Sequence, residues 1–199
     1  MGDIQEALGM FQKMMTYKYK FVVSHKKTAY DFELNFEEKD FRYMAGLHYL
    51  NDIDIPKAPK TLFEKIKNEK INDEYLNGSI NYNKVQDSYA NIQSRIYGLK
   101  YLERYLDNKN LICKYVKYMN QYSSIDADYM IKSTIEHRTA YIFKKRRKQR
   151  EGYCICSFFI EPQREYKGIG VYWLYKSKVR LDDSTEVVLY DRLNNEAAN

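Results

Sequence analysis

Apolar residues follow two different periods in the first forty positions of the chain. Over residues 3–15 they recur at steps of three and four, which predicts an N-terminal helix. Residues 17–23 and 30–36 instead alternate between apolar and polar, with a polar turn between the two runs. Period-two alternation is typical of half-buried strands, so these runs predict an antiparallel β-hairpin.

Helical periodicity dominates the middle of the chain. It predicts helices over residues 38–50, 61–71, 82–106 and 111–119. The segment 82–106 has the longest regular pattern, with apolar residues at Val85, Tyr89, Ile92, Ile96, Leu99, Leu102 and Leu106.

Strand-forming residues dominate the C-terminal third. β-Branched and aromatic residues are concentrated in 129–131, 139–143, 153–160, 171–175 and 186–190. We therefore predict an α+β fold with an N-terminal β-hairpin, a central helical part and a C-terminal antiparallel sheet of about four strands. The expected organisation is a single domain, 1–199. It comprises an N-terminal helix (1–16), a hairpin plus helices (17–122), a basic antiparallel sheet (123–193) and a disordered tail (194–199).

Positive charge is concentrated in this predicted sheet. The whole chain has a formal charge of +6, whereas Arg138 to Arg180 contains 12 Lys and Arg against 3 Glu, a net +9. A basic region on a near-neutral body is the pattern expected for binding a polyanion. Nucleic acid is therefore the partner that the charge favours, and the charge alone does not separate RNA from DNA.

Six of the seven residues from Lys144 to Arg150 are cations, between two predicted strands. Such a hairpin tip can lie along phosphates, and the alternative is a solvated turn that discourages aggregation. Exposed aromatic rings beside the cations would stack on unpaired bases. The predicted nucleic-acid-binding residues are Arg138, Lys144, Arg146, Arg147, Lys148, Arg150 and Tyr172.

The three histidines are candidates for acid–base chemistry. A ribonuclease that works without a metal ion needs groups to accept and donate protons, and cations to stabilise the charge on phosphate. His137 is the preferred acid or base because it begins the basic sheet, with Lys176 among the phosphate-binding candidates. His48 lies on the apolar face of a predicted helix, where a core or boundary histidine is the competing interpretation. His25 lies in a hairpin loop and is expected to be inert.

Other classes of protein fit the sequence poorly. There is no glycine-rich phosphate loop, and the carboxylates are not clustered as a two-metal nuclease requires. The three cysteines form an odd set without a second Cys/His pair for zinc, which favours reduced thiols in the cytoplasm. No targeting signal or long apolar run is present, so we expect a cytoplasmic protein with no metal, no cofactor and no membrane contact.

One segment resembles a known family. Residues 41–53 read Phe41-Arg42-Tyr43-Met44-Ala45-Gly46-Leu47-His48-Tyr49-Leu50-Asn51-Asp52-Ile53. With Asn35-Phe36 before it, this segment resembles the F-x-H-L-x-G-L-x-x-L-x-D-I segment of phage- and mobile-element-borne nucleases of the Barnase–EndoU–ColicinE5/D–RelE (BECR) group, type 4. The order of hairpin, helices and closing aromatic strands over residues 17–192 is also similar to that family.

The resemblance implies a helical part followed by a four-stranded antiparallel sheet of the barnase–RelE kind. It also implies that RNA is cut on the concave face of this sheet without a metal ion, in a toxin or effector. Tyr43 stands where the family has histidine, so Tyr43 or His48 would contribute from the helix. The predicted function is an endoribonuclease, a hydrolase of RNA. The alternatives are a non-catalytic nucleic-acid-binding module and a protein-interaction module that binds an antitoxin or phage protein.

Overall fold

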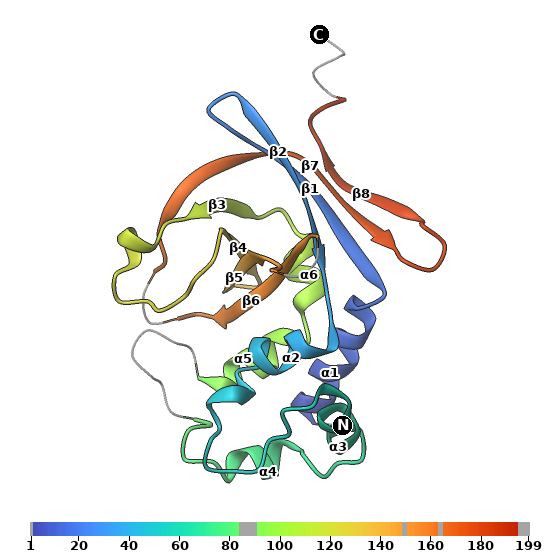
Figure 1. Cartoon of the computed structure of the whole chain (residues 1–199), viewed down its shortest axis with the longest axis vertical. Coiled ribbons are helices and arrows are strands. Elements are labelled where there is room, and N and C mark those ends of the chain that lie inside the picture. The colour runs from blue at the N-terminus through green and yellow to red at the C-terminus, as the bar shows by residue number, and fades with distance from the viewer. Residues whose placement is uncertain (1, 84–90, 149–150, 163–164, 195–199) are drawn as a thin grey trace.

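A closed β-barrel forms the centre of the computed structural model, which describes residues 2–83, 91–148, 151–162 and 165–194 (Figure 1). Within these ranges the strands follow the order β1-β2-β6-β5-β4-β3-β7-β8, and pairing of β1 with β7 closes seven of them into a barrel. Strand β8 is an extra strand on the outer side of β7. The strands are β1 (Tyr17–His25), β2 (Thr28–Asn35), β3 (Leu111–Tyr115), β4 (Tyr129–Ile135), β5 (Arg138–Arg146), β6 (Tyr153–Ile160), β7 (Gly168–Arg180) and β8 (Glu186–Asp191).

This barrel shows that the predicted α+β fold with a four-stranded C-terminal sheet is wrong. The N-terminal hairpin does form, but it belongs to the same sheet as the C-terminal strands. Strand β1 pairs antiparallel with β7 from Tyr17 opposite Arg180 to Ser24 opposite Tyr172. Strand β2 pairs in parallel with β6 at Leu34 and Tyr153, which makes the barrel mixed. The alternating pattern is the same in an open sheet and in a barrel, so the sequence alone could not reveal this closure.

Strand β7 is the longest strand described and holds the barrel together. Its first residues pair with β3, and its later residues lie between β1 and β8. The apolar pattern had predicted a strand only over 171–175. The strand continues through the polar residues Lys176 and Lys178, and both are buried under α6 (Leu102–Asp107). Their amines are satisfied by groups on that helix, which is why polar residues can occupy an inward-facing position here.

Short helices surround one end of the barrel, in the lower half of Figure 1. Helices α2 and α5 contact β6, and α1 packs against α3, α5 and α6. Besides α6, the helices in the described ranges are α1 (Asp3–Met14), α2 (Glu38–Met44), α3 (Pro59–Lys67), α4 (Asp73–Asn77) and α5 (Ile92–Leu99), with 3-10 turns η1 (Leu47–Tyr49) and η2 (Lys117–Asn120). The N-terminal helix is where the sequence predicted it.

Two helix predictions in the middle of the chain were wrong. Residues 111–119 form β3 and η2, because the cluster of Ile, Cys, Tyr and Val is compatible with a short strand as well as with a helix turn. The described part of 82–106 contains α5 and α6 rather than one helix, and Val85 and Tyr89 lie outside the described residues. Pro59 begins α3, two residues before the expected start, as proline favours the first helical turn.

Strand alternation divides the apolar residues between two cores. Ile142, Phe158 and Ile131 face the barrel interior, where they join a core that extends to the helices. Tyr141, Phe143 and Phe159 face outward and form a second core with Tyr166 and residues before β4. Both faces of β5 are therefore buried near its middle, and the strand emerges at its basic C-terminal end.

Candidate functional site

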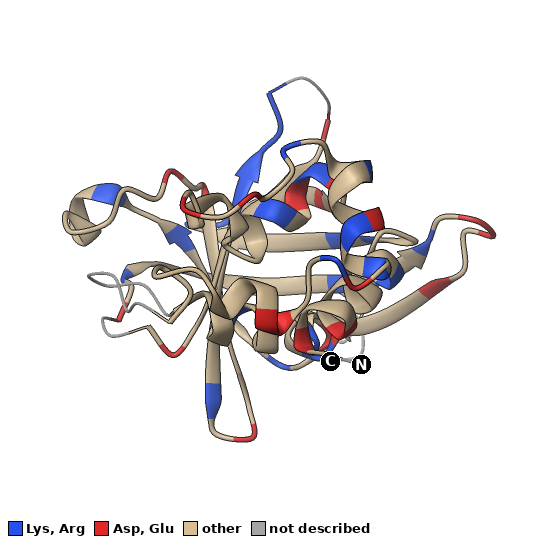
Figure 2. Ribbon diagram, turned by 90° about the horizontal axis from the view of Figure 1, so that it is seen from below, with Lys and Arg blue, Asp and Glu red and all other residues tan. Residues whose placement is uncertain are grey.

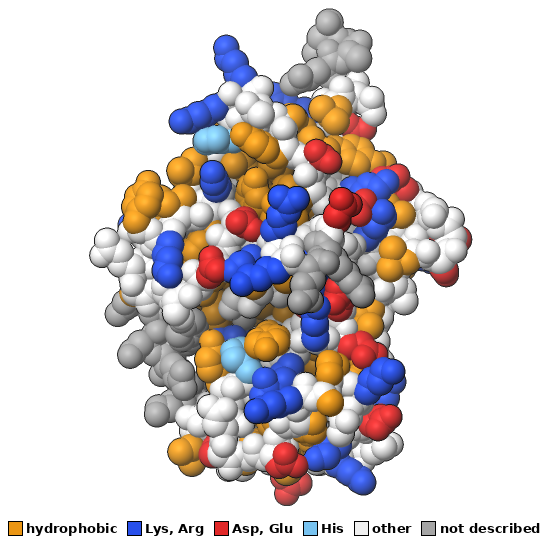
Figure 3. Space-filling view, viewed as in Figure 1, with side chains coloured by type: hydrophobic (Ala, Val, Ile, Leu, Met, Phe, Trp, Pro, Cys, Tyr) orange, Lys and Arg blue, Asp and Glu red, His pale blue; other side chains and the backbone are white. Residues whose placement is uncertain are grey.

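The basic end of β5 borders a cleft of about 680 Å³ beside helix α2. Figure 2 shows this lysine- and arginine-rich strand end projecting from the body of the molecule. Lysine and arginine side chains also lie in the middle of the face in Figure 3, interspersed with acidic side chains. The cleft is lined by Glu37, Lys39, Asp40, Tyr43, Lys145, Arg146, Arg147, Lys148, Cys154, Ile155 and Cys156.

Arg147 supports the wall of the cleft, because its charge is already neutralised. Its guanidinium forms an ion pair with Asp40 and donates to the carbonyl oxygen of Asn35 at 3.0 Å. Its Nε lies 3.3 Å from Glu37 Oε1. The side chains of Arg147 and Asp40 are 6% and 7% exposed. Burial raises the pKa of Asp40 above its ordinary value, although Arg147 opposes the shift. This buried pair fixes the end of β5 to α2.

Two other cations of the cleft are also paired with carboxylates. Lys145 forms an ion pair with Asp126, and Lys39 lies 2.8 Å from Glu37. By contrast, the side chains of Arg146 and Lys148 are exposed, and neither forms an ion pair with a carboxylate among the residues described. The Asp128 carboxylate accepts only from the backbone N–H of Arg146, at 2.8 Å. The charge available to an anion is therefore concentrated on Arg146 and Lys148. Arg150 follows in sequence but lies outside the described residues.

Tyr43 and His48 lie next to each other at the α2 side of the cleft. Helix α2 ends at Met44, and Gly46 adopts a left-handed conformation with φ 75° that reverses the chain into η1. The rings of Tyr43 and His48 are consequently 5.1 Å apart between centroids. Tyr43 is 50% exposed and lines the cleft, whereas His48 is half-buried behind it.

The environment of His48 keeps its imidazole neutral. Burial, together with the charges of Arg95 and Arg42, lowers the pKa of His48 to about 4, against the opposing effect of the Arg42 carbonyl. Nδ1 lies 3.5 Å from this carbonyl oxygen. If Nδ1 carries the proton, Nε2 is left as a proton acceptor. A neutral imidazole beside a tyrosine hydroxyl can accept a proton but cannot donate one at neutral pH.

The two cysteines of β6 line the cleft floor. Cys156 lies at a bulge, where β5 and β6 change register between Phe143 and Lys144. Burial raises the pKa of Cys154 and raises that of Cys156 to about 12, so both thiols are protonated at neutral pH. Neither is therefore poised as a nucleophile.

Lys144 points into the barrel rather than into the cleft. Its side chain is fully buried, and its Nζ lies 3.7 Å from the centroid of the Phe32 ring and 4.2 Å from that of Phe21. The Nζ has no hydrogen-bond partner, and burial lowers the pKa of Lys144 well below its ordinary value. A fully buried amine does not reach a phosphate, so Lys144 does not join the predicted nucleic-acid-binding residues at the surface.

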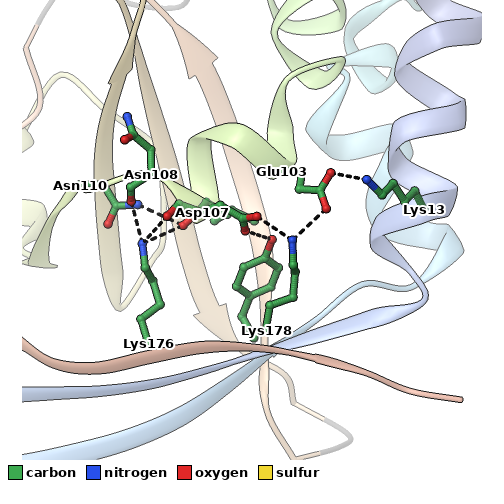
Figure 4. Close-up of polar contacts among 9 residues, drawn as sticks. Lys13, Glu103, Asp107, Asn108, Asn110, Lys176 and Lys178 are labelled. Atoms are coloured by element: carbon green, nitrogen blue, oxygen red, sulfur yellow. Dashed lines mark hydrogen bonds and ion pairs between the residues drawn. The ribbon is translucent and has the colours of Figure 1, made fainter. Parts of the chain in front are cut away.

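Lys176 is also buried, inside the junction between α6 and β7 (Figure 4). Its Nζ donates to the carbonyl oxygens of Leu106 at 2.9 Å, Asp107 at 3.3 Å and Asn108 at 2.7 Å. Burial lowers the pKa of Lys176 to about 8. These three bonds occupy the hydrogens of the ammonium group, so Lys176 caps the C-terminus of α6 rather than facing a substrate.

A connected set of ion pairs continues from this junction. Lys178 lies 2.6 Å from Asp107 and 2.8 Å from Glu103, and Glu103 also contacts Lys13 at 2.5 Å (Figure 4). The Tyr19 hydroxyl donates to Asp107 at 2.6 Å. Burial, followed by the charge of Asp107, raises the pKa of Tyr19. Each carboxylate is matched by a cation or hydroxyl, so this set joins α1 and α6 to the barrel.

His137 and Arg138 lie at the opposite end of β5 from the basic cleft. His137 is exposed in the β4–β5 turn, where Glu136 and His137 both have positive φ. Arg138 lies 4.7 Å from the centroid of the Tyr97 ring. Eight residues of strand separate His137 from Lys145, which corresponds to about 26 Å. The structure therefore does not bring His137 together with Tyr43, His48 and Arg146.

The acidic partners in the cleft were not identified from the sequence. Glu37 and Asp40 cap the N-terminus of α2, with Asp40 Oδ2 accepting from the Glu37 backbone N–H at 2.9 Å. A capping box over 37–40 was the available signal. The sequence did not show that the same carboxylates would neutralise Arg147, because the two segments are 107 residues apart.

Neither a membrane-crossing helix nor a metal-binding cluster is present in the described ranges. No helix there is long and apolar enough to cross a membrane. No group of three or more His, Cys, Asp and Glu residues there is arranged to hold a metal ion.

Comparison with known proteins identifies the family of this chain, whose barrel carries a basic cleft beside a tyrosine and a histidine. The family model described as phage-Barnase-EndoU-ColicinE5/D-RelE like nuclease 4 matches residues 3–193. Because the match covers most of the chain, the protein belongs to this family of phage nuclease-like proteins. Searches of curated proteins and of solved structures returned no match.

Proposed function

We propose that the protein is an endoribonuclease that cuts RNA in the cleft between α2 and the basic end of β5, without a metal ion. The observation that carries the proposal is that Tyr43, whose ring contacts His48, lines the same cleft as Arg146 and Lys148. The family membership supports a nuclease, and the cations support a polyanionic substrate.

The proposed reaction is attack of a ribose 2′-oxygen on the adjacent phosphorus, which releases the 5′-oxygen. Arg146 and Lys148 would hold the phosphate and stabilise the charge that develops on it. His48 is neutral and would take the 2′-hydroxyl proton. Tyr43 would donate a hydrogen bond to the phosphate, and the leaving 5′-oxygen would take a proton from water. This chemistry makes a 2′,3′-cyclic phosphate and needs no metal ion, because cations of the protein oppose the phosphate charge.

Product chemistry provides the test of this proposal. Purified protein is incubated with RNA in EDTA, and the new ends are analysed. We expect cleavage with a 2′,3′-cyclic phosphate on one fragment and a 5′-hydroxyl on the other. DNA of the same sequence lacks the 2′-hydroxyl and should remain intact. Cleavage of both nucleic acids, or cleavage only with added Mg²⁺, would contradict the proposed chemistry.

A non-catalytic nucleic-acid-binding module is the second candidate. It is favoured by the low pKa of His48, which makes this imidazole a weak base, and by Tyr43 at the position of the family's histidine. This candidate predicts RNA that stays intact at enzyme excess while binding weakens steeply with salt. Binding without cleavage would therefore support it over the ribonuclease.

A further inference from the structure

A second hollow of about 400 Å³ lies between the start of β3 and the β7–β8 ribbon. Small-molecule sites range from about 300 to 1,000 Å³, so this volume suits one nucleotide. We call it the β3–β7 groove. The lining residues used in the argument are Lys109, Leu111, Tyr172, Trp173, Tyr190 and Arg192.

Hydrogen bonds fix the position of the groove's wall. The Lys176 amine binds the three carbonyl oxygens at the end of α6, which holds the segment leading to β3 against β7 (Figure 4). Trp173 Nε1 donates to the carbonyl oxygen of Asn110 at 2.8 Å. Lys109 and Asn110 are therefore held in place by two side chains of the opposite wall. A wall fixed in this way binds a ligand with little cost of ordering.

The groove exposes large apolar side chains beside cations. Tyr172 is 70% exposed and Leu111 is 67% exposed, and both lie next to the paired residues Ile112 and Val171, on the same side of this antiparallel pair. Exposed apolar groups that lie together often mark a binding site. Lys109 contributes positive charge, and no carboxylate belongs to the described lining of the groove. The surface thus combines an exposed ring with a cation.

We propose that the β3–β7 groove binds one unpaired nucleotide of a single-stranded nucleic acid. The base stacks on Tyr172, and its phosphate contacts Lys109. Stacking of a base on an aromatic ring beside a cation is the usual way in which proteins bind unpaired strands. A protein partner is the competing occupant, but the absence of acidic lining residues favours a polyanion. The inference rests on the proposed function in taking RNA as the natural strand.

The experiment measures binding of a fluorescent 12-nucleotide single strand of 2′-O-methyl RNA by anisotropy. This probe has no free 2′-hydroxyl, so it reports binding independently of the proposed cleavage. Tyr172→Ala is compared with wild-type protein on the single strand and on the matching duplex. We expect single-strand affinity to fall by about 5- to 150-fold, the range for loss of one stacked base. Duplex affinity should stay within about twofold, because paired bases are not available to stack.

Two variants make the result specific to the ring. Tyr172→Phe keeps the ring and should bind like wild-type protein. Tyr118→Ala removes a tyrosine that is 71% exposed but lies outside the lining of the groove, and it should have no effect. Lys109→Ala should weaken both probes at low salt, through loss of a phosphate contact. All variants are checked for wild-type thermal unfolding.

The possible outcomes separate the inference from the proposed function. Wild-type single-strand binding by Tyr172→Ala would overturn the inference even if the protein cuts RNA, and would leave a protein partner as the occupant of the groove. Equal losses for Tyr172→Ala and Tyr118→Ala would also overturn it, since no particular ring would be involved. A selective loss for Tyr172→Ala with RNA that is never cut would support the inference and contradict the proposed ribonuclease.

Discussion

The Arg147 guanidinium forms a buried ion pair with the Asp40 carboxylate, which joins the basic end of β5 to the first turn of α2. Neighbouring cations in one sequence run therefore have different roles. Lys144 is buried in the barrel, Arg147 is paired inside the wall, and Arg146 and Lys148 are exposed to the cleft. The cations look equivalent in the sequence, but the structure directs their side chains to different environments.

Substitutions in the basic run should differ in their effect on the stability of the protein. Arg147→Ala leaves the buried Asp40 without its cation, and we expect a loss of about 3–5 kcal/mol in the free energy of unfolding. Arg146→Ala removes an exposed side chain and should change that free energy by less than about 0.5 kcal/mol. Urea unfolding of both variants measures the difference. Similar stabilities for the two would show that the pair does not hold the cleft together.

Lys144→Met should stabilise the protein at neutral pH by about 1–2 kcal/mol. The substitution replaces a buried amine that has no hydrogen-bond partner with an apolar chain of similar length. Because the folded-state pKa of Lys144 lies below its ordinary value, the unfolded state binds more protons between the two values. Wild-type stability should therefore rise with pH in this window, and the advantage of Lys144→Met should shrink toward pH 10. A variant less stable than wild type at pH 7 would indicate that the aromatic rings hold the ammonium favourably.

His48 should make the protein less stable in acid. Its folded-state pKa of about 4 lies below the ordinary value of 6.5, so the unfolded state binds more protons between these values. Stability should therefore fall as pH decreases from 6.5 to 4. His48→Gln should lose this part of the pH dependence, whereas His137→Gln, at an exposed turn, should keep it. Urea titrations at several pH values measure the effect, and identical profiles for wild type and His48→Gln would contradict a neutral buried imidazole.

The separate elements of the fold could be predicted far better than their assembly. Period-two alternation located β1 and β2, the concentration of β-branched and aromatic residues located β6, and helical spacing located α1, because these patterns are local. Closure of the barrel depends on pairing between β1 and β7, which lie more than 140 positions apart in the chain. Pairing over such a distance leaves no local pattern in the sequence. The length of β7 was also underestimated, because Lys176 and Lys178 are polar. In the structure, groups of α6 accept hydrogen bonds from the amines of both residues.

The types of residue in the candidate site could be predicted from the sequence, but which of them come together could not. The basic run and the segment with Tyr43 and His48 were both visible in sequence, and the barrel brings them to one cleft. His137 was preferred because it begins the basic sheet. In the structure it precedes the start of β5, whereas the basic run lies at the end of that strand, and a strand separates its two ends by about 3.3 Å per residue. Strand alternation likewise turned Lys144 inward.

RNA binding should depend on salt through the two exposed cations. Each phosphate contact on a single strand adds about 0.7 to the slope of log affinity against log salt. Arg146→Ala/Lys148→Ala should therefore reduce this slope by about 1.4 with uncleavable RNA. The control Lys67→Ala/Lys70→Ala removes the same charge from α3 and the turn after it, and should leave the slope unchanged. Equal slope changes in both double variants would indicate a response to net charge alone.

The central claim is that RNA is cut in the cleft between α2 and the basic end of β5. It is tested most directly by single-turnover cleavage of one RNA in EDTA, with wild type, Arg146→Ala/Lys148→Ala, Tyr43→Phe and Lys67→Ala/Lys70→Ala. We predict that wild type and the α3 control cut at the same rate. At subsaturating enzyme, both cleft variants should be at least about tenfold slower, the effect of removing one charge-stabilising or hydrogen-bonding group. Intact RNA at wild-type excess, or cleft variants that cut like wild type, would contradict the claim.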